Sequence, residues 1–402
     1  MREFSATLHS PAKINLGITI PYRYSNGYHH IITPLYPISL FDILDIKISK
    51  AREDSFNLSW ENSIPEKFST ILVQSMVFES NYKNNILYKT FTKIKYLLAK
   101  ENPHSAALNL LQDVQVSIHI NKSIPSPCGL GGGSSNSAIF VKAILQYLKI
   151  NLAKEEFLDA CTIIESSLLS IGSDVPFFMQ NKPALVSGIG EISSFLPNQI
   201  TFLGILLVPD FGMGTSQMYQ SLNKPLFNQE TESLIIRYGL KSSLQGDQNL
   251  YSSQIQEIGR YEKAYNLLIE LLNREIKESK QNNILDVHSE FLTIMKQNEY
   301  DSVTMINSFM DTAETLYPEK SKVIQNGIES ATILLNEELY KAGKKRVLIN
   351  SLSGSGSASY VMFPLLQNEN SDLFLSLIKN VKEKLAHSKS NLLCYDFSTL
   401  LN

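Results

Sequence analysis

Apolar and polar residues alternate in several segments of the chain, which is the pattern of half-buried β-strands. In KINLGITI (13–20) the isoleucine and leucine residues occupy one face, while Lys13, Asn15 and two small residues occupy the other. DILDIKI (42–48) alternates too, and VQVSIHI (114–120) is the clearest strand in the sequence. The first half of the chain is therefore predicted to be rich in strands.

Helices are predicted where apolar residues recur at spacings of three and four. The segment SNSAIFVKAILQYL has this spacing at Ala138, Val141, Leu145 and Leu148, so a helix follows the clearest strand. Further helices are expected at about 85–100, 154–170 and 371–387, and further strands at 183–192, 202–209 and on both sides of residues 351–359.

The length of 402 residues exceeds what one hydrophobic core usually organises, so two domains are expected. The order of elements indicates the α+β class, with an N-terminal domain over residues 1–190 and a C-terminal domain over residues 191–402. Most of residues 217–345 follows helical patterns rich in lysine, glutamate, glutamine and asparagine.

The formal net charge of −3 provides no basic field for nucleic acid or an anionic membrane, so neither partner is expected. Cys128, Cys161 and Cys394 are scattered without metal-ligand spacing, which suits a reducing compartment. The first residues lack a signal-peptide pattern, and the most apolar run, 202–208, is far shorter than the roughly 20 residues that span a bilayer. A cytoplasmic protein is therefore predicted, and its oligomeric state is left open.

The segment SPCGLGGGSS (126–135), here called the glycine loop, joins the clearest strand to the following helix. Glycine permits positive φ and close approach to a ligand, and the unpaired N–H groups of a helix N-terminus bind anions such as phosphate. The loop is not a Walker A motif, because no Gly-Lys-Ser/Thr ends it, and it lacks the acidic residue of a dinucleotide fingerprint. It predicts a phosphate site, with a flexible surface loop as the alternative.

Other features are ambiguous when each is taken alone. SLSGSGSAS (351–359), here called the serine loop, is either a hairpin turn or part of a site. Asp174 lies just before a proline-bounded turn and is either a helix N-cap or a catalytic acid, while Lys13 is either a solvated strand residue or a functional one. His29 and His30 are adjacent, but no second cluster of ligands accompanies them, so no metal site is predicted.

Together, four collinear motifs resemble the GHMP kinases, a superfamily named for galactokinase, homoserine kinase, mevalonate kinase and phosphomevalonate kinase. The motifs are SPAKINL…NGYHHI, IPSPCGLGGGSSNSA, GSDVPFF…SGIGEI and SGSGSASY, in this order between about residues 10 and 360. The resemblance implies a two-domain α+β GHMP kinase fold and an ATP-dependent kinase that acts on a small molecule. The first motif is similar to that of members whose substrate is the cytidine diphosphate of a sugar alcohol.

The resemblance also implies roles for individual residues. Lys13 and Asp174 match the catalytic pair, and Mg²⁺ would accompany ATP without a dedicated set of metal ligands. The implied ATP-binding residues are Asn85, Pro127, Cys128, Gly129, Leu130, Gly131, Gly132, Gly133, Ser134 and Ser135. The implied substrate-binding residues are Asn15, Tyr28, His29, Asp174, Gly354 and Ser355, of which Tyr28 and His29 would hold the cytosine.

The chain departs from the family pattern in two respects. Leu35 stands where members often carry an aromatic residue, and Tyr36 lies on the opposite side of a regular strand. The chain is also longer than expected, with the excess near residues 62–83 and in a helical insertion at about 217–300. Two alternatives stay open: another kinase or decarboxylase of the superfamily, acting for example on a mevalonate derivative, and a catalytically silent nucleotide-binding protein.

Overall fold

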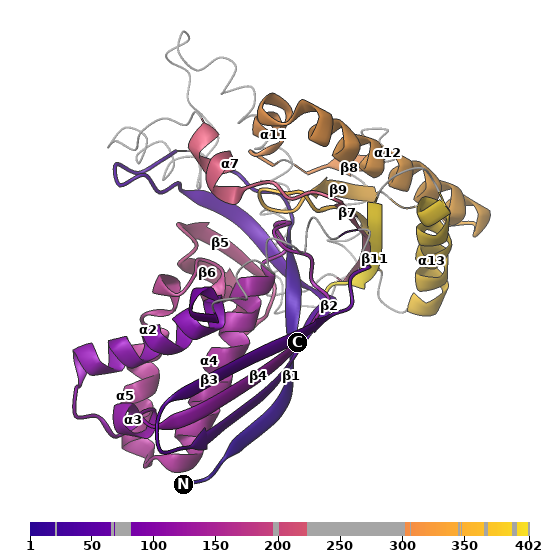
Figure 1. Cartoon of the computed structure of the whole chain (residues 1–402). Coiled ribbons are helices and arrows are strands. Elements are labelled where there is room, and N and C mark those ends of the chain that lie inside the picture. The colour runs from indigo at the N-terminus through magenta and orange to yellow at the C-terminus, as the bar shows by residue number, and fades with distance from the viewer. Residues whose placement is uncertain are drawn as a thin grey trace, which may run out of the picture.

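The computed structural model describes residues 1–20, 22–65, 68, 82–195, 201–222, 302–305, 307–344, 346, 348–365, 369–387 and 392–400. Within these ranges the chain forms two β-sheets, each with helices packed against it (Figure 1). The α+β class predicted from the order of elements is confirmed. None of the helices in these ranges combines the length and the apolarity that a membrane span requires.

The first sheet has six strands and is organised by one long strand. Its strands are β1 (Phe4–Asn15), β2 (Ile31–Lys50), β3 (Ser55–Asn62), β4 (Val114–Lys122), β5 (Ala184–Gly188) and β6 (Ile192–Phe195). The long strand β2 pairs with β1 on one side and, along different parts of its length, with β4 and β5 on the other. β3 and β4 run parallel, whereas the other pairs are antiparallel.

Helices cover one face of this sheet (Figure 1). They are α2 (Ile86–Glu101), α3 (Ala106–Leu110), α4 (Gly132–Asn151), α5 (Lys154–Glu165) and α6 (Val175–Gln180), with 3₁₀ turns at Tyr82–Asn84 and Leu168–Ser170. Phe140 and Ile144 of α4 pack with Val116 and Ile118 of β4 in one hydrophobic core. The predicted alternation of β4 thus buries one face, because its apolar side chains are removed from water there.

The second sheet has the strand order β11-β7-β10-β9-β8. Its elements are β7 (Phe202–Pro209), α7 (Thr215–Ser221), β8 (Ser302–Thr304), α11 (Met310–Leu316), α12 (Pro318–Lys341), β9 (Leu348–Leu352), β10 (Ser359–Pro364), α13 (Ser371–His387) and β11 (Leu392–Ser398). Every residue of β7, β9 and β10 is buried, so both faces of this sheet are covered. Residues of α12 and α13 share a core with one of these faces.

The two sheets meet through a core of their own. Ala12 and Ile14 of β1 and Tyr36 of β2 pack with Leu206 of β7 and Tyr360 of β10. The second sheet covers the face of β1 that carries Ala12 and Ile14, and the residues 129–131 contact the face that carries Lys13, so the last six residues of the strand are all buried. The polar side chains of Lys13 and Asn15, in this part of β1, are therefore enclosed rather than exposed to water.

The boundaries of β1 differ from the prediction. A single strand was expected over residues 13–20, but β1 ends at Asn15 and Gly17 takes a positive φ of 77°. Beyond it, Ile18 and Thr19 form only isolated bridges. The early start of β1 at Phe4 and the strands β3 and β11 were not predicted, although Phe56, Leu58 and Trp60 of β3 do alternate with polar residues.

Three predictions concern residues that the structure covers only in part. The helical insertion at about 217–300 and the excess near 62–83 lie mostly outside the described residues, so both stay predictions. The domain boundary at residue 190 also stays a prediction. Along the chain, β6 is the last strand of the first sheet and β7 is the next strand, which belongs to the second.

Candidate active site

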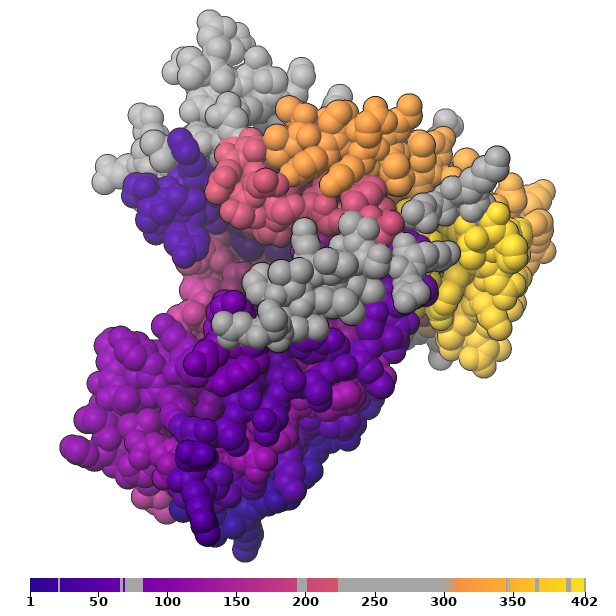
Figure 2. Space-filling view, in the orientation of Figure 1, coloured from indigo at the N-terminus to yellow at the C-terminus, as the bar shows by residue number. Residues whose placement is uncertain are grey.

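A cavity of about 810 Å³ is lined by residues of the first sheet and by helices and loops that accompany the two sheets. Its walls include the glycine loop, the serine loop, the end of β1 and helix α7. In the space-filling view, the surface is indented between the lobe formed by α2–α5 and the lobe that contains α7 (Figure 2). Motifs that are distant in the sequence are therefore brought to one place.

The glycine loop presents the N-terminus of α4 to this cavity. Gly131 is the N-cap residue, with a left-handed φ of 71°, and no side chain caps the helix. Gly132, Gly133 and Ser134, which form the first turn, all line the cavity. The N–H groups of a first helical turn lack partners within the helix and carry the positive end of its dipole. This wall of the cavity is therefore suited to an anion.

Two of the glycines are required by close packing as well as by conformation. A Cβ atom at Gly129 would lie 2.1 Å from the carbonyl oxygen of Ser353, in the serine loop. A Cβ atom at Gly131 would lie 2.9 Å from the ring of Phe178 and 3.1 Å from Cγ of Lys13. The glycine loop thus touches both the serine loop and β1, which no side chain at these positions would permit.

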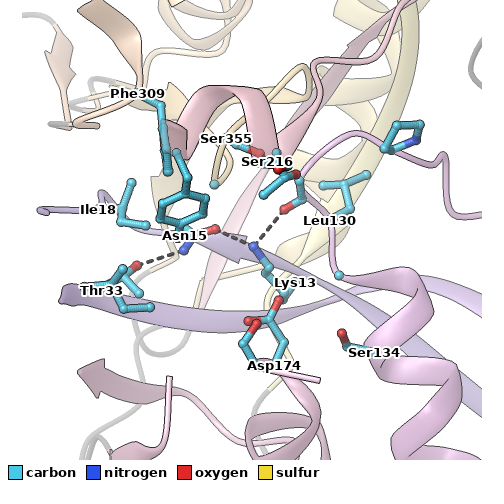
Figure 3. Close-up of a pocket in the computed structure, with 18 of the residues that line it drawn as sticks. Lys13, Asn15, Ile18, Thr33, Leu130, Ser134, Asp174, Ser216, Phe309 and Ser355 are labelled. Carbon is cyan, nitrogen blue, oxygen red and sulfur yellow. Dashed lines mark hydrogen bonds between the residues drawn. The ribbon is translucent and has the colours of Figure 1, made fainter. Parts of the chain in front are cut away.

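Lys13 is enclosed at the end of β1, where only 4% of its surface is exposed. Its Nζ donates hydrogen bonds to Oδ1 of Asn15, at 2.5 Å, and to the carbonyl oxygen of Gly129, at 2.7 Å (Figure 3). Burial lowers the pKa of the Lys13 ammonium, and the negative charge of Asp174 opposes this effect. An ammonium carries three donors, so one N–H remains for a ligand in the cavity.

Asp174 occupies the N-cap position of α6, directly before the proline-containing first turn of that helix. Its side chain makes no capping hydrogen bond, although capping was the structural alternative for this residue. The carboxylate lines the cavity instead, next to Lys13 (Figure 3). A carboxylate that neither caps a helix nor forms a direct ion pair is free to accept a proton from a ligand.

The two serines of the glycine loop are placed differently. Ser134 lines the cavity, whereas Ser135 is fully buried and its Oγ accepts a hydrogen bond from Oγ of Ser10 at 2.7 Å. Asn85, a predicted ATP-binding residue, is not among the residues that line the cavity: its Oδ1 caps α2 by accepting from the N–H of Leu87 at 2.9 Å. The neighbouring Ile86 does line the cavity.

Pro127, Cys128 and Leu130, the other predicted residues of the glycine loop, also line the cavity. The Cys128 thiol is buried, which raises its pKa to about 12 and keeps it protonated at neutral pH. The carbonyl oxygen of Cys128 accepts a hydrogen bond from the N–H of Ala358 at 3.1 Å. This part of the glycine loop is thus fastened to the serine loop.

The serine loop contributes its predicted residues Gly354 and Ser355 to the cavity wall. The Oγ of Ser355 lies 2.9 Å from Oγ1 of Thr215, at the start of α7. Asn307 positions the loop, because its Nδ2 donates to the carbonyl oxygens of Leu352 at 2.9 Å and Gly354 at 2.8 Å. The serine loop is thus the connection of the antiparallel hairpin β9–β10, as one of the two alternatives had it, and it also lines the cavity.

An aromatic region forms another end of the cavity. Tyr28 and His29, on the hairpin of residues 22–30, line it, and 59% of Tyr28 is exposed. The ring of His29 lies 5.3 Å from that of Tyr219 in α7, which in turn meets Phe309 at 4.8 Å. All these distances are within the range of favourable ring contacts.

Leu35 and Tyr36 take opposite sides of β2, as the period of a strand predicts. Leu35 lines the cavity, whereas Tyr36 is 98% buried in the core between the sheets, with its ring 5.6 Å from that of Phe202. Tyr36 therefore does not supply an aromatic wall to the cavity. Tyr219 of helix α7 provides an aromatic wall instead.

Several lining residues were missed by the sequence analysis. Thr33 accepts a hydrogen bond from Nδ2 of Asn15 at 3.0 Å and donates to the carbonyl oxygen of Gly17 at 2.6 Å, which orients the Asn15 amide. Arg23, Tyr219 and Phe309 also line the cavity. No local pattern marks Tyr219 or Phe309, because both reach the site only through the fold of the second sheet.

Among the described residues, no group of three or more histidine, cysteine, aspartate or glutamate side chains is arranged to hold a metal ion. The oxygen donors that line the cavity include the Ser134 hydroxyl, in the glycine loop, and the Asp174 carboxylate. Mg²⁺ prefers oxygen ligands and usually reaches such sites bound to phosphate groups and water, with one or two carboxylates. These two residues fit an ion of that kind.

The chain is similar to known proteins. A family model described as "GHMP kinases N terminal domain" matches residues 90–182. A crystal structure of 4-(cytidine 5'-diphospho)-2C-methyl-D-erythritol kinase is similar at a TM-score of 0.49 and 19% identity, with 98% of each chain covered.

Curated relatives named 4-diphosphocytidyl-2-C-methyl-D-erythritol kinase are more similar in sequence. The protein of Leptospira biflexa is 33% identical over 54% of this chain and 64% of its own length, which is less than two thirds of that relative. The protein of Leptospira interrogans is 36% identical over 59% of this chain and 75% of its own length. That of Thermosipho melanesiensis is 31% identical over 69% of this chain and 82% of its own length. The chain belongs to the 4-diphosphocytidyl-2-C-methyl-D-erythritol kinase family of the GHMP kinases.

Proposed function

We propose that this protein transfers the γ-phosphoryl group of ATP to the 2-hydroxyl of 4-diphosphocytidyl-2-C-methyl-D-erythritol, in the non-mevalonate route to isoprenoid precursors. The observation that carries the proposal is the position of Lys13 and Asp174 at one cavity whose wall includes the uncapped N-terminus of α4. Family membership agrees with this activity.

The phosphate groups of ATP would bind at the glycine loop. The backbone N–H groups of Gly132, Gly133 and Ser134 and the dipole of α4 favour negative charge there. Mg²⁺, when bound with ATP, would supply countercharge to the phosphates, and Ser134 is the residue of the glycine loop that would hold it, which leaves Asp174 for the proton of the acceptor. Ser135 is excluded from this role, since its hydroxyl is buried against Ser10.

Asp174 would act as the general base. It accepts the proton of the acceptor hydroxyl while that oxygen forms a bond to the γ-phosphorus and the bond from the γ-phosphorus to the β–γ bridging oxygen breaks, leaving ADP. Lys13 would stabilise the negative charge on the transferred group, with its ammonium held in place by Asn15 and Gly129. Lys13 is held in place before the substrate arrives, so little reorganisation of this group is needed during transfer.

The cytosine would bind in the aromatic region. Tyr28 and Tyr219 provide faces on which a base can stack, and His29 provides a ring nitrogen for its polar edge. A mevalonate or homoserine site has no need for such a region. This feature favours the cytidine compound over the acceptors of other GHMP kinases.

The test is ADP release from MgATP with 4-diphosphocytidyl-2-C-methyl-D-erythritol, mevalonate or homoserine as the acceptor. Release that depends on the cytidine compound alone would support the proposal. Release with mevalonate or homoserine instead would assign a different substrate. Absence of release with every acceptor, despite measurable ATP binding, would contradict the kinase activity and favour a nucleotide-binding protein.

A further inference from the structure

A buried ion pair lies beneath the glycine loop and outside the cavity. Asp42 of β2 is completely buried, and its Oδ2 lies 2.5 Å from Nζ of Lys122 at the end of β4. Neither residue lines the cavity, and neither was predicted to have a role. Burying two charges is costly, and such pairs often contribute little net stability. The presence of this pair is therefore better explained by the segments of the chain that it connects than by a gain in stability.

The Asp42 carboxylate connects the two ends of the glycine loop. On the side where the chain enters the loop, Oδ1 accepts the N–H groups of Ser123 and Ile124, both at 2.8 Å. On the side where the chain leaves it, Oδ2 accepts Nδ2 of Asn136, in the first turns of α4, at 3.0 Å. One side chain therefore holds the residues immediately before and after the loop.

Lys122 completes this arrangement. Its Nζ donates a second hydrogen bond, to the carbonyl oxygen of Ile124 at 2.8 Å. The same nitrogen would lie 3.3 Å from a Cβ atom at Gly132, so the ammonium is packed behind the first turn of α4. Asp42 neutralises a cation that would otherwise oppose the positive end of the α4 dipole. Both members of the pair thus act on the backbone that faces the cavity.

We propose that Asp42, with Lys122 and Asn136, positions the glycine loop for phosphate binding. Residues 125–135 are rich in glycine, and a chain of this kind loses much conformational entropy when it is ordered around a ligand. Holding both ends of the loop at one carboxylate removes part of that loss before ATP arrives. Asp42 is a positioning residue, since it acts through the loop and not on the substrate.

The inference rests on the proposed ATP-dependent function and is tested with two variants that keep the net charge. Asn136→Ala removes the connection to α4 and leaves the ion pair intact. The double variant Asp42→Asn, Lys122→Met removes both charges and keeps an oxygen that can accept from Ser123 and Ile124. Each variant should raise the Kd and KM of ATP at least ~10-fold, since a hydrogen bond to a charged group is lost from a preformed site.

The Kd of the cytidine substrate should stay unchanged in both variants, because the aromatic region is not attached to these residues. The matched control is Asp54→Asn, Lys95→Met. That pair is also 2.5 Å apart, and Asp54 also accepts a backbone N–H, from Val114, but neither residue lines the cavity. This control should leave both Kd values unchanged while it lowers the midpoint of urea unfolding.

Calorimetric titration of the unmodified protein with MgATP separates the two hypotheses. If the wild-type protein binds ATP and both variants bind it more weakly, the inference is supported. If the wild-type protein and both variants bind ATP equally well, the inference is overturned and the proposed function still stands. If both variants weaken the binding of ATP and of the cytidine substrate equally, their effect is general destabilisation and the positioning role is wrong. If the wild-type protein does not bind ATP, both hypotheses fail.

Discussion

The ammonium nitrogen of Lys13 lies 2.7 Å from the carbonyl oxygen of Gly129. The same oxygen accepts a hydrogen bond from Oγ of Ser353 at 3.1 Å. One peptide carbonyl of the glycine loop is therefore shared by a cation from β1 and a hydroxyl from the serine loop. Because each partner belongs to a different part of the sequence, the orientation of Lys13 depends on how the two sheets pack.

Replacing Gly129 with alanine should disturb this contact severely. The residue has a φ of 78°, and its Cβ atom would meet the Ser353 oxygen. Gly129→Ala should lower the free energy of unfolding, measured in urea, and reduce kcat. Gly343→Ala is the control, because its φ of 67° is similar but no atom lies within 4 Å of the added Cβ. The control should lower the free energy of unfolding by only about 1–2 kcal/mol, which is the cost of the backbone strain alone. If both substitutions lower the free energy of unfolding equally, the packing argument is wrong.

The pH dependence of kcat should have an alkaline limb set by Lys13. Burial lowers the pKa of this ammonium from its ordinary value of 10.5, so its proton is lost at a lower pH than that of an exposed lysine. Activity that needs the charged form should fall as pH rises through this lowered pKa. In Lys13→Arg the limb should disappear while kcat falls at all pH values, since the guanidinium stays charged but has a different shape. A persisting limb would assign it to another group.

Asp174→Asn should separate binding from chemistry. The amide keeps the shape of the side chain but cannot take the proton of the acceptor hydroxyl. ATP and the cytidine substrate should bind as before, and kcat should fall at least ~10²-fold, the lower range for a lost general base. Titration calorimetry and steady-state ADP release measure the two effects. Near-normal turnover would remove Asp174 from the mechanism.

The aromatic region should determine affinity for the cytidine substrate and not for ATP. Tyr28→Ala and Tyr219→Ala should each weaken binding of the cytidine substrate by ~1–3 kcal/mol, the usual range for a lost stacking contact with a base. Tyr340→Ala, at a position in α12 that is 84% exposed, is the matched control and should change neither Kd. If both cavity variants bind the substrate normally, the base is bound elsewhere.

The contact between α12 and α13 should make stability depend on pH. Oε1 of Glu338 accepts hydrogen bonds from Nζ of Lys341 at 2.8 Å and Nζ of Lys384 at 2.7 Å, and Oε2 accepts from Asn380. These contacts lower the pKa of Glu338 from 4.5 to about 2. The stabilisation is therefore complete above pH 4.5 and is lost as the pH falls toward 2.

Urea unfolding of Glu338→Gln and the wild-type protein at several pH values checks this prediction. The difference in unfolding free energy should be largest near neutral pH and should shrink between pH 4.5 and about 2. A difference that does not change with pH would mean that the carboxylate charge contributes nothing to this contact.

Much of the fold was predictable because its patterns are local. β4 buries the face that its alternation indicates, whereas α4, which was also predicted, is buried on nearly every side and not only on the face that its spacing indicates. The glycine loop was placed correctly between these two elements. The placement of Lys13, Asp174, Tyr28 and His29 at one cavity was implied by motif resemblance and agrees with the structure.

The remaining features depend on contacts between distant segments. A strand pattern indicates which side of β1 carries Lys13, but only the glycine loop, which reaches that side from a distant part of the sequence, makes it a buried one. The same applies to Ser134 and Ser135: the sequence marked both as candidates, and the position of β1 decides which hydroxyl is covered. Tyr219 reaches the aromatic region because α7 packs beside the hairpin of residues 22–30.

The sequence by itself thus indicated several of the longer elements, such as β4 and α4, the order of the motifs and the chemical groups available to the site. The tertiary structure decided which of those groups face the cavity and which are held behind it, as Asp42 and Lys122 are. The physical reason is that periodicity is a property of one segment and its solvent. Burial on a second face and the pairing of buried charges require another segment, whose position no local pattern contains.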